Sequence, residues 1–262
     1  MLSAVVITLN EEKNIAQCLQ SLLNVADEIV VVDSGSTDQT EQICRQFGSK
    51  IIFITQKWLG YARQKNFANT QTHFDFILSV DADEVLSKPL IAELLDLKKQ
   101  FINNKNLIHK TYTLNRLTHY CGKPIRHCGW FPDKKVRLFN KNYFEWQGDS
   151  VHEQLVQKNG LNTKFTSIEL RSLLNHYSYY TVGEHWHRID VYSSLEAKHL
   201  FEQGKKVYFW HFIFPPTVKF LNMYVFKLGF LDGFEGFVLC MLSGYGRFLR
   251  YAKLKALRSK AL

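Results

Sequence analysis

Long hydrophobic runs are missing from this chain of 262 residues. No stretch of about 18 residues is free of Lys, Asp, Glu, His and Pro, and a helix that crosses a bilayer needs roughly that length or more. The chain also begins directly in a strand-like segment, without the charged and long apolar regions of a secretory signal. A spanning helix and export are therefore not expected, although 46% hydrophobic residues suffice for a large core.

Glycine-rich phosphate motifs and paired cysteines are missing too. The sequence contains neither G-x-G-x-x-G nor the Walker lysine motif, which weighs against dinucleotide oxidoreductases and P-loop enzymes. Cys121 and Cys128 are the only close pair among five scattered cysteines, and no second pair completes a zinc site. Reduced thiols in a cytoplasmic protein are the simpler interpretation.

Charge is present but unevenly placed. The net charge is +9, and residues 205–262 hold ten Lys or Arg against two acidic residues, so residues 1–204 are nearly neutral. A basic, aromatic tail suggests an anionic partner surface, either a membrane or a nucleic acid. We therefore expect three parts: 1–100 and 101–204 as two halves of one domain, and 205–262 as a helical tail.

Buried-strand patterns alternate with helical patterns over the first 100 residues. This alternation predicts an α/β fold, in which a Rossmann-like, mostly parallel sheet carries helices on both faces. The expected strands are Ser3–Leu9, Glu28–Val32, Lys50–Ile54 and Phe74–Val80. The expected helices follow Asn10 as an N-cap, with Glu11 and Glu12 in the first turn, and cover Thr40–Phe47 and Tyr61–Asn69.

The fourth strand ends in a group of acidic residues, in the sequence FDFILSVDADE. Ligands bind at the carboxyl ends of strands in such sheets, and alternate side chains of an extended segment share a face. Asp81 and Asp83 would therefore converge, and Mg²⁺ or Mn²⁺ would relieve their repulsion. The alternative is an acidic turn that caps a helix beginning near Ser87.

The second strand ends in the loop DSGSTD. Asp33 is well placed there to accept a hydrogen bond from a nucleotide base, and Gly35 would let a ligand approach the backbone closely. The alternative is a plain turn with a helix cap at Asp38. Further on, Arg63 and Lys65 either reach a diphosphate or are solvated helix residues.

The character of the chain changes from Asn106. The segments Ile108–Leu117 and Lys135–Asn140 read as strands, and FEWQGDSVHEQL at 144–155 gathers aromatic and titratable residues. Glu153 is the preferred general base, followed by Asp149 and Glu84. Trp146 offers a face for a sugar ring or belongs to the core. His152 orients Glu153, reaches a metal or is structural, and His176 is a weaker candidate metal ligand.

In their order, these motifs resemble the family 2 glycosyltransferases of the GT-A fold. The motifs of the second half are similar to bacterial lipopolysaccharide-core glucosyltransferases that extend the inner-core heptose. The first set is Thr8-Leu9-Asn10-Glu11, Val31–Asp38 and Asp81–Asp83. The second set is Val136-Arg137-Leu138-Phe139, Trp146, Val151-His152-Glu153 and Asn175-His176-Tyr177.

The resemblance implies a role for each matching residue. The uridine pocket would be lined by Thr8, Asn10, Glu11 and Asp33. Arg63 and Lys65 would approach the diphosphate, Asp81 would hold the ribose or the metal, and Asp83 would ligate the divalent cation. The reaction would invert the anomeric carbon by direct displacement, with one carboxylate on the acceptor side as general base.

The tail reads as amphipathic helices. We expect helices at Tyr180–Gln203, Thr217–Leu231 and Gly233–Leu257, the last two with Lys and Arg among aromatic and Leu positions. They suit the membrane interface, where apolar residues dip in and basic residues meet lipid phosphates. The alternative is a helical hairpin packed on the acceptor half, with its basic face solvated. Nucleic acid is a poorer fit, because the basic residues lie among long aliphatic runs.

The sequence thus predicts a metal-dependent transferase that moves a hexose, preferably glucose from UDP-glucose, to a lipid-linked saccharide of the lipopolysaccharide inner core. It would work at the inner face of the bacterial cytoplasmic membrane. A sugar nucleotidyltransferase would need a glycine-rich, basic loop where Asn10-Glu11-Glu12 stands. A binding protein without catalysis is the non-enzymatic alternative.

Overall fold

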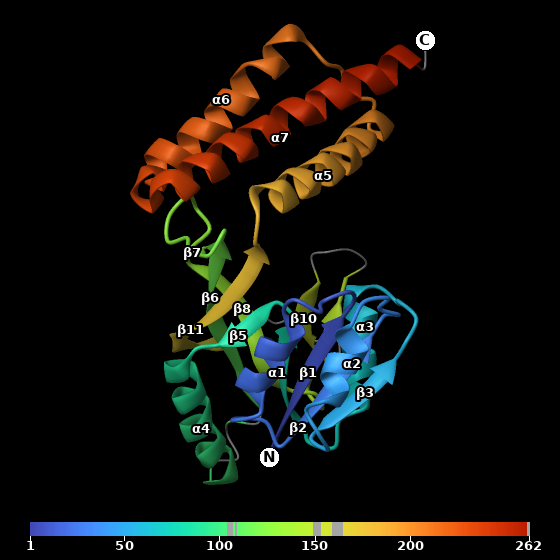
Figure 1. Ribbon diagram of the computed structural model, residues 1–262, viewed down its shortest axis with the longest axis vertical. Coiled ribbons are helices and arrows are strands. Elements are labelled where there is room, and N and C mark those ends of the chain that lie inside the picture. The colour runs from blue at the N-terminus through green and yellow to red at the C-terminus, as the bar shows by residue number, and fades with distance from the viewer. Residues whose placement is uncertain (104–106, 108, 149–152, 159–164, 261–262) are drawn as a thin grey trace. The chain divides into compact units, whose positions relative to one another are not determined.

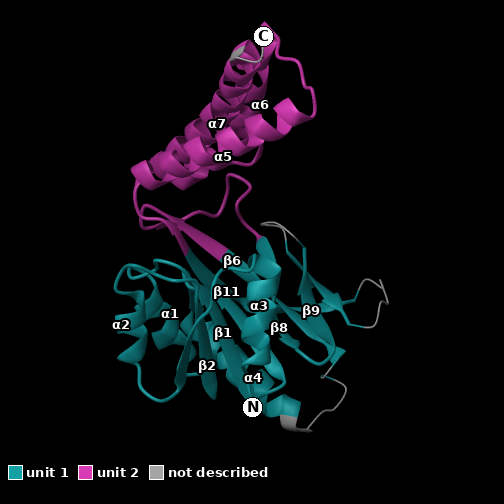
Figure 2. Ribbon diagram, turned by 90° about the vertical axis from the view of Figure 1, so that its right-hand side faces the viewer, with its two compact units in different colours: residues 1–116, 133–176 teal, residues 117–132, 177–262 magenta. Residues whose placement is uncertain are grey.

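A computed structural model describes residues 1–103, 107, 109–148, 153–158 and 165–260 (Figure 1). The described chain divides into two compact units, shown in Figure 2. Unit 1 comprises residues 1–116 and 133–176, and unit 2 comprises residues 117–132 and 177–262. Residues 182–202, which the sequence assigned to the acceptor half, thus belong with the tail helices.

Unit 1 is built on a mixed sheet with the order β3-β2-β1-β4-β8-β6-β11-β5. The first four of these strands are parallel, and antiparallel strands follow from β8. The sheet strands are β1 (Leu2–Thr8), β2 (Glu28–Asp33), β3 (Ile51–Thr55), β4 (Phe76–Asp81), β5 (Glu84–Leu86), β6 (Thr111–Tyr120), β8 (Asp133–Asn140) and β11 (Ser167–Tyr179). A separate hairpin joins β9 (Phe144–Gln147) to β10 (Gln154–Gln157).

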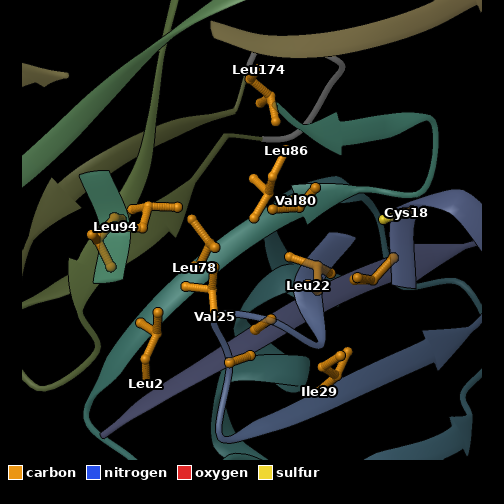
Figure 3. Packing of buried hydrophobic residues seen from close by; sticks show 14 of the residues in the cluster. Leu2, Cys18, Leu22, Val25, Ile29, Leu78, Val80, Leu86, Leu94 and Leu174 are labelled. Atoms are coloured by element: carbon orange, nitrogen blue, oxygen red, sulfur yellow. The ribbon is translucent and has the colours of Figure 1, made fainter. Parts of the chain in front are cut away.

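Helices cover both faces of this sheet. The helices are α1 (Ile15–Leu22), α2 (Thr40–Arg45), α3 (Tyr61–Thr70) and α4 (Lys88–Asn103). On one face, α1, α2 and α4 pack on alternate residues of β1, β2 and β4, and Figure 3 shows Leu22, Leu78 and Leu94 in this cluster. On the other face, α3 and the β9–β10 hairpin pack on the intervening residues. The predicted α/β class is confirmed.

The loop after β1 differs from the prediction. Asn10 does not cap a helix, because α1 begins at Ile15 with Asn14 as its N-cap. Asn10 instead has a φ of 55°, and its Oδ1 accepts a hydrogen bond of 2.8 Å from the backbone N–H of Thr37. Residues at 10–13 thus join the loops after β1 and β2 rather than starting a helix.

Unit 2 contains three long helical segments. The predicted helix at Tyr180–Gln203 is present as α5 (Val182–Glu202), where Thr181 and Glu184 form a capping box. The expected helix at 217–231 is broken instead, and Leu228 has a φ of 53°. Its range is divided among α6 (Phe214–Leu221), η3 (Asn222–Phe226) and η4 (Gly229–Asp232). The short helix η2 (Phe209–Phe212) precedes them, and α7 (Gly233–Lys260) follows. The short strand β7 (Lys123–Pro124) pairs with the end of β6.

None of the helices in the described ranges is both long enough and apolar enough to cross a membrane.

The core of unit 1 gives a direct stability prediction. Leu78 of β4 is fully buried between β1 and the helices, so Leu78→Ala should lower the free energy of unfolding by about 2–5 kcal/mol. Leu59→Ala is the control, because Leu59 is 43% exposed and surface truncations usually change stability by about 0.5 kcal/mol or less. Urea unfolding followed by circular dichroism measures both, and equal losses would contradict this packing.

Candidate active site

The carboxyl ends of β1, β2 and β4 meet at one edge of the sheet. Thr8 lies beside Asp33, and Ile7 lies beside Asp81, in the parallel register. This edge is where open α/β sheets bind ligands. The strand register therefore brings three of the predicted site residues together, although they are far apart in the sequence.

Asp33 is held by its own loop. Its carboxylate accepts hydrogen bonds from the backbone N–H of Gly35 at 2.9 Å and of Ser36 at 2.8 Å, and from the Ser36 hydroxyl at 2.5 Å. Gly35 takes a φ of 94°, which glycine adopts without strain. The adjacent Thr8 hydroxyl is buried and has no hydrogen-bond partner in the part of the chain that the structure describes. Its hydrogen-bonding capacity is therefore unused within these residues.

The first acidic residue of β4 belongs to an ion network. Asp81 is 31% exposed, and its carboxylate pairs with Arg137 of β8 and, at 3.3 Å, with the amine of Lys65 on α3. Burial disfavours the charged carboxylate, but Arg137 and Lys65 outweigh it and hold the pKa of Asp81 well below its usual range. Asp81 thus stays ionised at the sheet edge.

Glu84 lies deeper in the same network. Its side chain is fully buried, and its carboxylate pairs with Arg137 at 2.5 Å and with Arg116 at 3.2 Å. Its second oxygen accepts a hydrogen bond of 3.0 Å from the backbone N–H of Asp81. Glu84 is therefore excluded as a general base, because an acceptor hydroxyl has no access to it.

Lys65 is not a solvated helix residue, and in this structure it faces carboxylates. Its side chain is 3% exposed, and its amine lies 2.7 Å from Glu153 and 3.3 Å from Asp81. The amine also lies 4.9 Å from the centre of the Trp146 ring. Lys65 thus links the strand-end acid to the predicted base. Arg63, two residues earlier on α3, is exposed.

Asp83 and His176 form the second pair at this edge. His176 Nε2 lies 3.1 Å from Asp83 Oδ2, and both side chains are largely buried. The contact exists because β11 pairs with β5, which sets His176 opposite Glu84. Within the described ranges, no three His, Cys, Asp or Glu side chains form a set that would hold a metal alone. Mg²⁺ is commonly held by one or two carboxylates plus substrate phosphates. Of this pair, Asp83 is therefore the residue whose chemistry suits such a cation.

Of the two roles open for Trp146, the structure shows the core role and not the sugar-binding face. The indole is 6% exposed and packs edge-on against Phe139 in the core. Its backbone is fixed by Asn66 of α3, which bonds the N–H and the carbonyl of Trp146 at 2.9 and 2.7 Å. Trp146 therefore anchors the β9–β10 hairpin under Lys65. The other two predictions in this segment, Asp149 and His152, lie outside the described residues.

Arg137 and Arg116 are the site residues that the sequence reading missed. Arg137 stands in the apolar run VRLF of a strand, and its side chain is 4% exposed. A lone arginine inside such a run is the available signal, because arginine is rarely buried unless it is paired.

Comparisons with known proteins identify the family of the chain. A sequence model described as glycosyl transferase family 2 matches residues 3–145, which is more than half of the chain. The chain belongs to this family. The predicted family and enzyme class are thereby confirmed, and the protein is a glycosyltransferase.

Individual relatives align with nearly the whole length of this glycosyltransferase. An uncharacterized glycosyltransferase of Rickettsia typhi is 32% identical over 263 residues, covering 99% of this chain and 88% of the relative. The lipopolysaccharide core biosynthesis glycosyltransferase LpsC of Rhizobium meliloti is 32% identical over 260 residues, covering 97% and 91%. Among solved structures, TarS of Staphylococcus aureus aligns over 87% of this chain and 45% of its own, with 17% identity and a TM-score of 0.42.

The network predicts a large cost for losing Arg137. Arg137→Met would leave two carboxylates without their main counter-ion, and breaking a buried pair costs about 3–5 kcal/mol of unfolding free energy. Lys134→Met on the same strand is the control, because Lys134 and its partner Glu169 are both exposed and such pairs contribute about 0–1 kcal/mol. Urea unfolding of both variants checks this. Similar losses would show that Arg137 does not hold the network together.

Proposed function

We propose that this glycosyltransferase is an inverting, divalent-cation-dependent enzyme that transfers glucose from UDP-glucose to a sugar of the lipopolysaccharide inner core. The observation that carries the proposal is the gathering of Asp81, Asp83, His176 and Glu153 around one sheet edge. Likeness to LpsC over 97% of the chain supports the acceptor class.

The donor pocket would lie over the ends of β1 and β2. The buried Thr8 hydroxyl is a ready hydrogen-bond group, and Asp33 is fixed beside it by its own loop. Asn10 and Glu11 lie in the loop after β1. The Asn10 N–H donates to Ser36 Oγ of the Asp33 loop at 2.8 Å, and the Glu11 N–H donates to Thr40 Oγ1 at the start of α2, also at 2.8 Å. We assign the uridine to these four residues, and the exposed Arg63 to the diphosphate.

The cation would be held by Asp83 and His176, with Asp81 beside them and the donor phosphates completing the set. Mg²⁺ and Mn²⁺ both accept carboxylate and phosphate oxygens. When bound, the cation stabilises the negative charge that develops on the leaving diphosphate. The ionised state of Asp81, fixed by Arg137 and Lys65, suits a position next to a cation or a ribose hydroxyl.

Glu153 would act as the general base. An acceptor hydroxyl is a weak nucleophile, and removal of its proton during attack is typically worth about 10²–10⁴-fold in rate. The hydroxyl oxygen bonds to the anomeric carbon, its proton passes to Glu153, and UDP leaves from the opposite face. The side chain of Glu153 is 15% exposed, and the ion pair with Lys65 sets its position. Asp149 stays the second candidate.

Two other functions fit less well. A sugar nucleotidyltransferase also joins acidic metal ligands to an α/β sheet, but family membership and the loop at Asn10 argue against it. A binding protein without catalysis would keep the donor pocket but would not need Glu153 held over the site by Lys65.

Donor binding should depend on Asp83 and on the metal. UDP at 100 times its dissociation constant should stabilise the protein by about 2.7 kcal/mol, and we expect this gain with Mn²⁺ but not with EDTA. Asp83→Ala should abolish the metal-dependent part. Asp96→Ala, which removes a carboxylate that is 71% exposed on α4, should leave it intact. A thermal shift assay measures the response to UDP of the wild type with Mn²⁺, of the wild type with EDTA, and of each variant with Mn²⁺. An unchanged response of Asp83→Ala would reject Asp83 as a ligand.

Catalysis should depend on Glu153 without affecting the donor. Glu153→Gln should lower kcat at least about a hundredfold, in line with loss of a general base, while the thermal shift with UDP and Mn²⁺ stays at the wild-type value. Glu145→Gln on the adjacent strand β9 is the matched control and should keep wild-type kcat. A near-wild-type rate for Glu153→Gln would remove it from this role and direct attention to Asp149.

A further inference from the structure

The break in the tail helices produces an exposed helical hairpin in unit 2. The ring of Phe220 on α6 packs edge-on against Phe237 on α7, and Gly244 of α7 lies against Pro216. The two helices are therefore antiparallel, and the segment from η3 to the start of α7 forms the turn. Leu228, with a φ of 53°, stands where the helix breaks.

Large apolar side chains point outward along this hairpin. On α6 and η3 they recur at i, i+4, i+7 and i+11, which is one helical face. Their exposed fractions are 64% for Phe214, 60% for Val218, 42% for Leu221 and 46% for Val225. This stripe, η2 and the turn together make a surface that we call the aromatic face. Its most exposed members are Phe209, Phe214, Val218, Phe226, Leu231 and Phe234.

The acidic groups of the hairpin are neutralised inside unit 2. Asp232 is 4% exposed and accepts hydrogen bonds from the backbone N–H groups of Arg126 and His127 and from the His127 ring. Glu235 pairs with Lys123 at 3.1 Å. No acidic group of this segment therefore opposes an anionic partner.

Basic groups at the aromatic face are available. Lys205, Lys206 and Lys227 are exposed, and none of them has an ion pair among the residues that the structure describes. Lys205 and Lys206 line a hollow of about 510 Å³, together with Tyr208, Trp210 and His211. A hollow with lysines beside aromatic rings fits a lipid phosphate at the level of the headgroups.

Three basic residues near the C-terminus are paired within unit 2. Arg247 and Arg250 pair with Glu196 of α5, and Lys253 pairs with Asp190 at 2.6 Å. These contacts fasten α7 to α5. The charge of the tail is thus partly structural, and an attachment surface must be sought elsewhere in unit 2.

We propose that the aromatic face inserts into the interface of an anionic lipid bilayer. Exposed aromatic and aliphatic side chains bordered by unpaired lysines are the features of helices that lie in this plane. A twofold contact between two copies would set like patches against each other, and it would bring these lysines together without acidic partners. The inference deepens the proposed function, whose acceptor is carried on a lipid, but it is tested without donor or acceptor.

Flotation of the full chain with lipid vesicles tests the proposal. The protein should float with vesicles of phosphatidylglycerol and phosphatidylcholine, and much less with phosphatidylcholine alone. The double variant Phe226→Ser/Phe234→Ser should reduce the vesicle partition coefficient at least tenfold. Both side chains are more than 70% exposed, so the fold should survive, and circular dichroism checks this. Leu195→Ser on α5, where Leu195 is 58% exposed, is the control and should float as the wild type does.

The lysines and the oligomeric state complete the test. Lys206→Glu/Lys227→Glu should weaken binding to the anionic vesicles at least fivefold and leave the weak binding to phosphatidylcholine unchanged. The proposal is overturned if the wild-type protein floats with neither vesicle, or if the phenylalanine variant floats like the wild type. It is also overturned if sedimentation shows a wild-type dimer that Phe226→Ser/Phe234→Ser dissociates while vesicle binding is absent. Loss of UDP binding alone would affect the proposed function and not this inference.

Discussion

The buried charge network at the end of β4 is the constraint on which the site depends. Asp81 ends β4 and Glu84 begins β5, and Arg137 from β8 pairs with both carboxylates. Leaving them uncompensated would cost about 3–5 kcal/mol, a large part of the 5–15 kcal/mol or so by which domains are usually stable. The position of β8 against β4 is therefore an electrostatic requirement as well as a matter of packing.

The same network gives neighbouring carboxylates different surroundings. Glu84 is sealed and structural, Asp81 is kept ionised at the edge, and Asp83 faces His176 instead of an arginine. Lys65 then reaches from Asp81 to Glu153, so that these two carboxylates share one ammonium group. Burial and pairing thus give four chemically similar side chains four different surroundings.

Much of the fold follows from local pattern, and the site follows only in part. Apolar runs correctly marked β1, β2 and β4, because both faces of these strands are covered and their sequences read as continuous hydrophobic stretches. Asp81 and Asp83 were found because they directly follow such a run. The partner of Asp83 is 93 residues away, and the pairing of β11 with β5 leaves no local mark on the sequence.

Predictions that were open or wrong have physical causes as well. For Trp146 a sugar-binding face and a core position were both open, and contacts with Asn66 and Phe139 decide for the core. Asn10 resembles an N-cap, but its left-handed backbone and its bond to Thr37 serve the neighbouring loop. In the tail, composition indicated a basic surface, whereas pairing with α5 consumes several of its charges. In each case the deciding contact comes from a distant segment.

The order of the chain gives the central network a consequence for biosynthesis. A ribosome releases β1, β2 and β4 before it releases Arg137, and the carboxylates of Asp81 and Glu84 are then without their main counter-ion. Lys65 and Arg116, the other counter-ions of these carboxylates, precede Arg137 in the chain. Glu153 and His176 follow Arg137 within the next 40 residues. A chain released only as far as β6 therefore lacks the main counter-ion of the network and two of the residues proposed for the site.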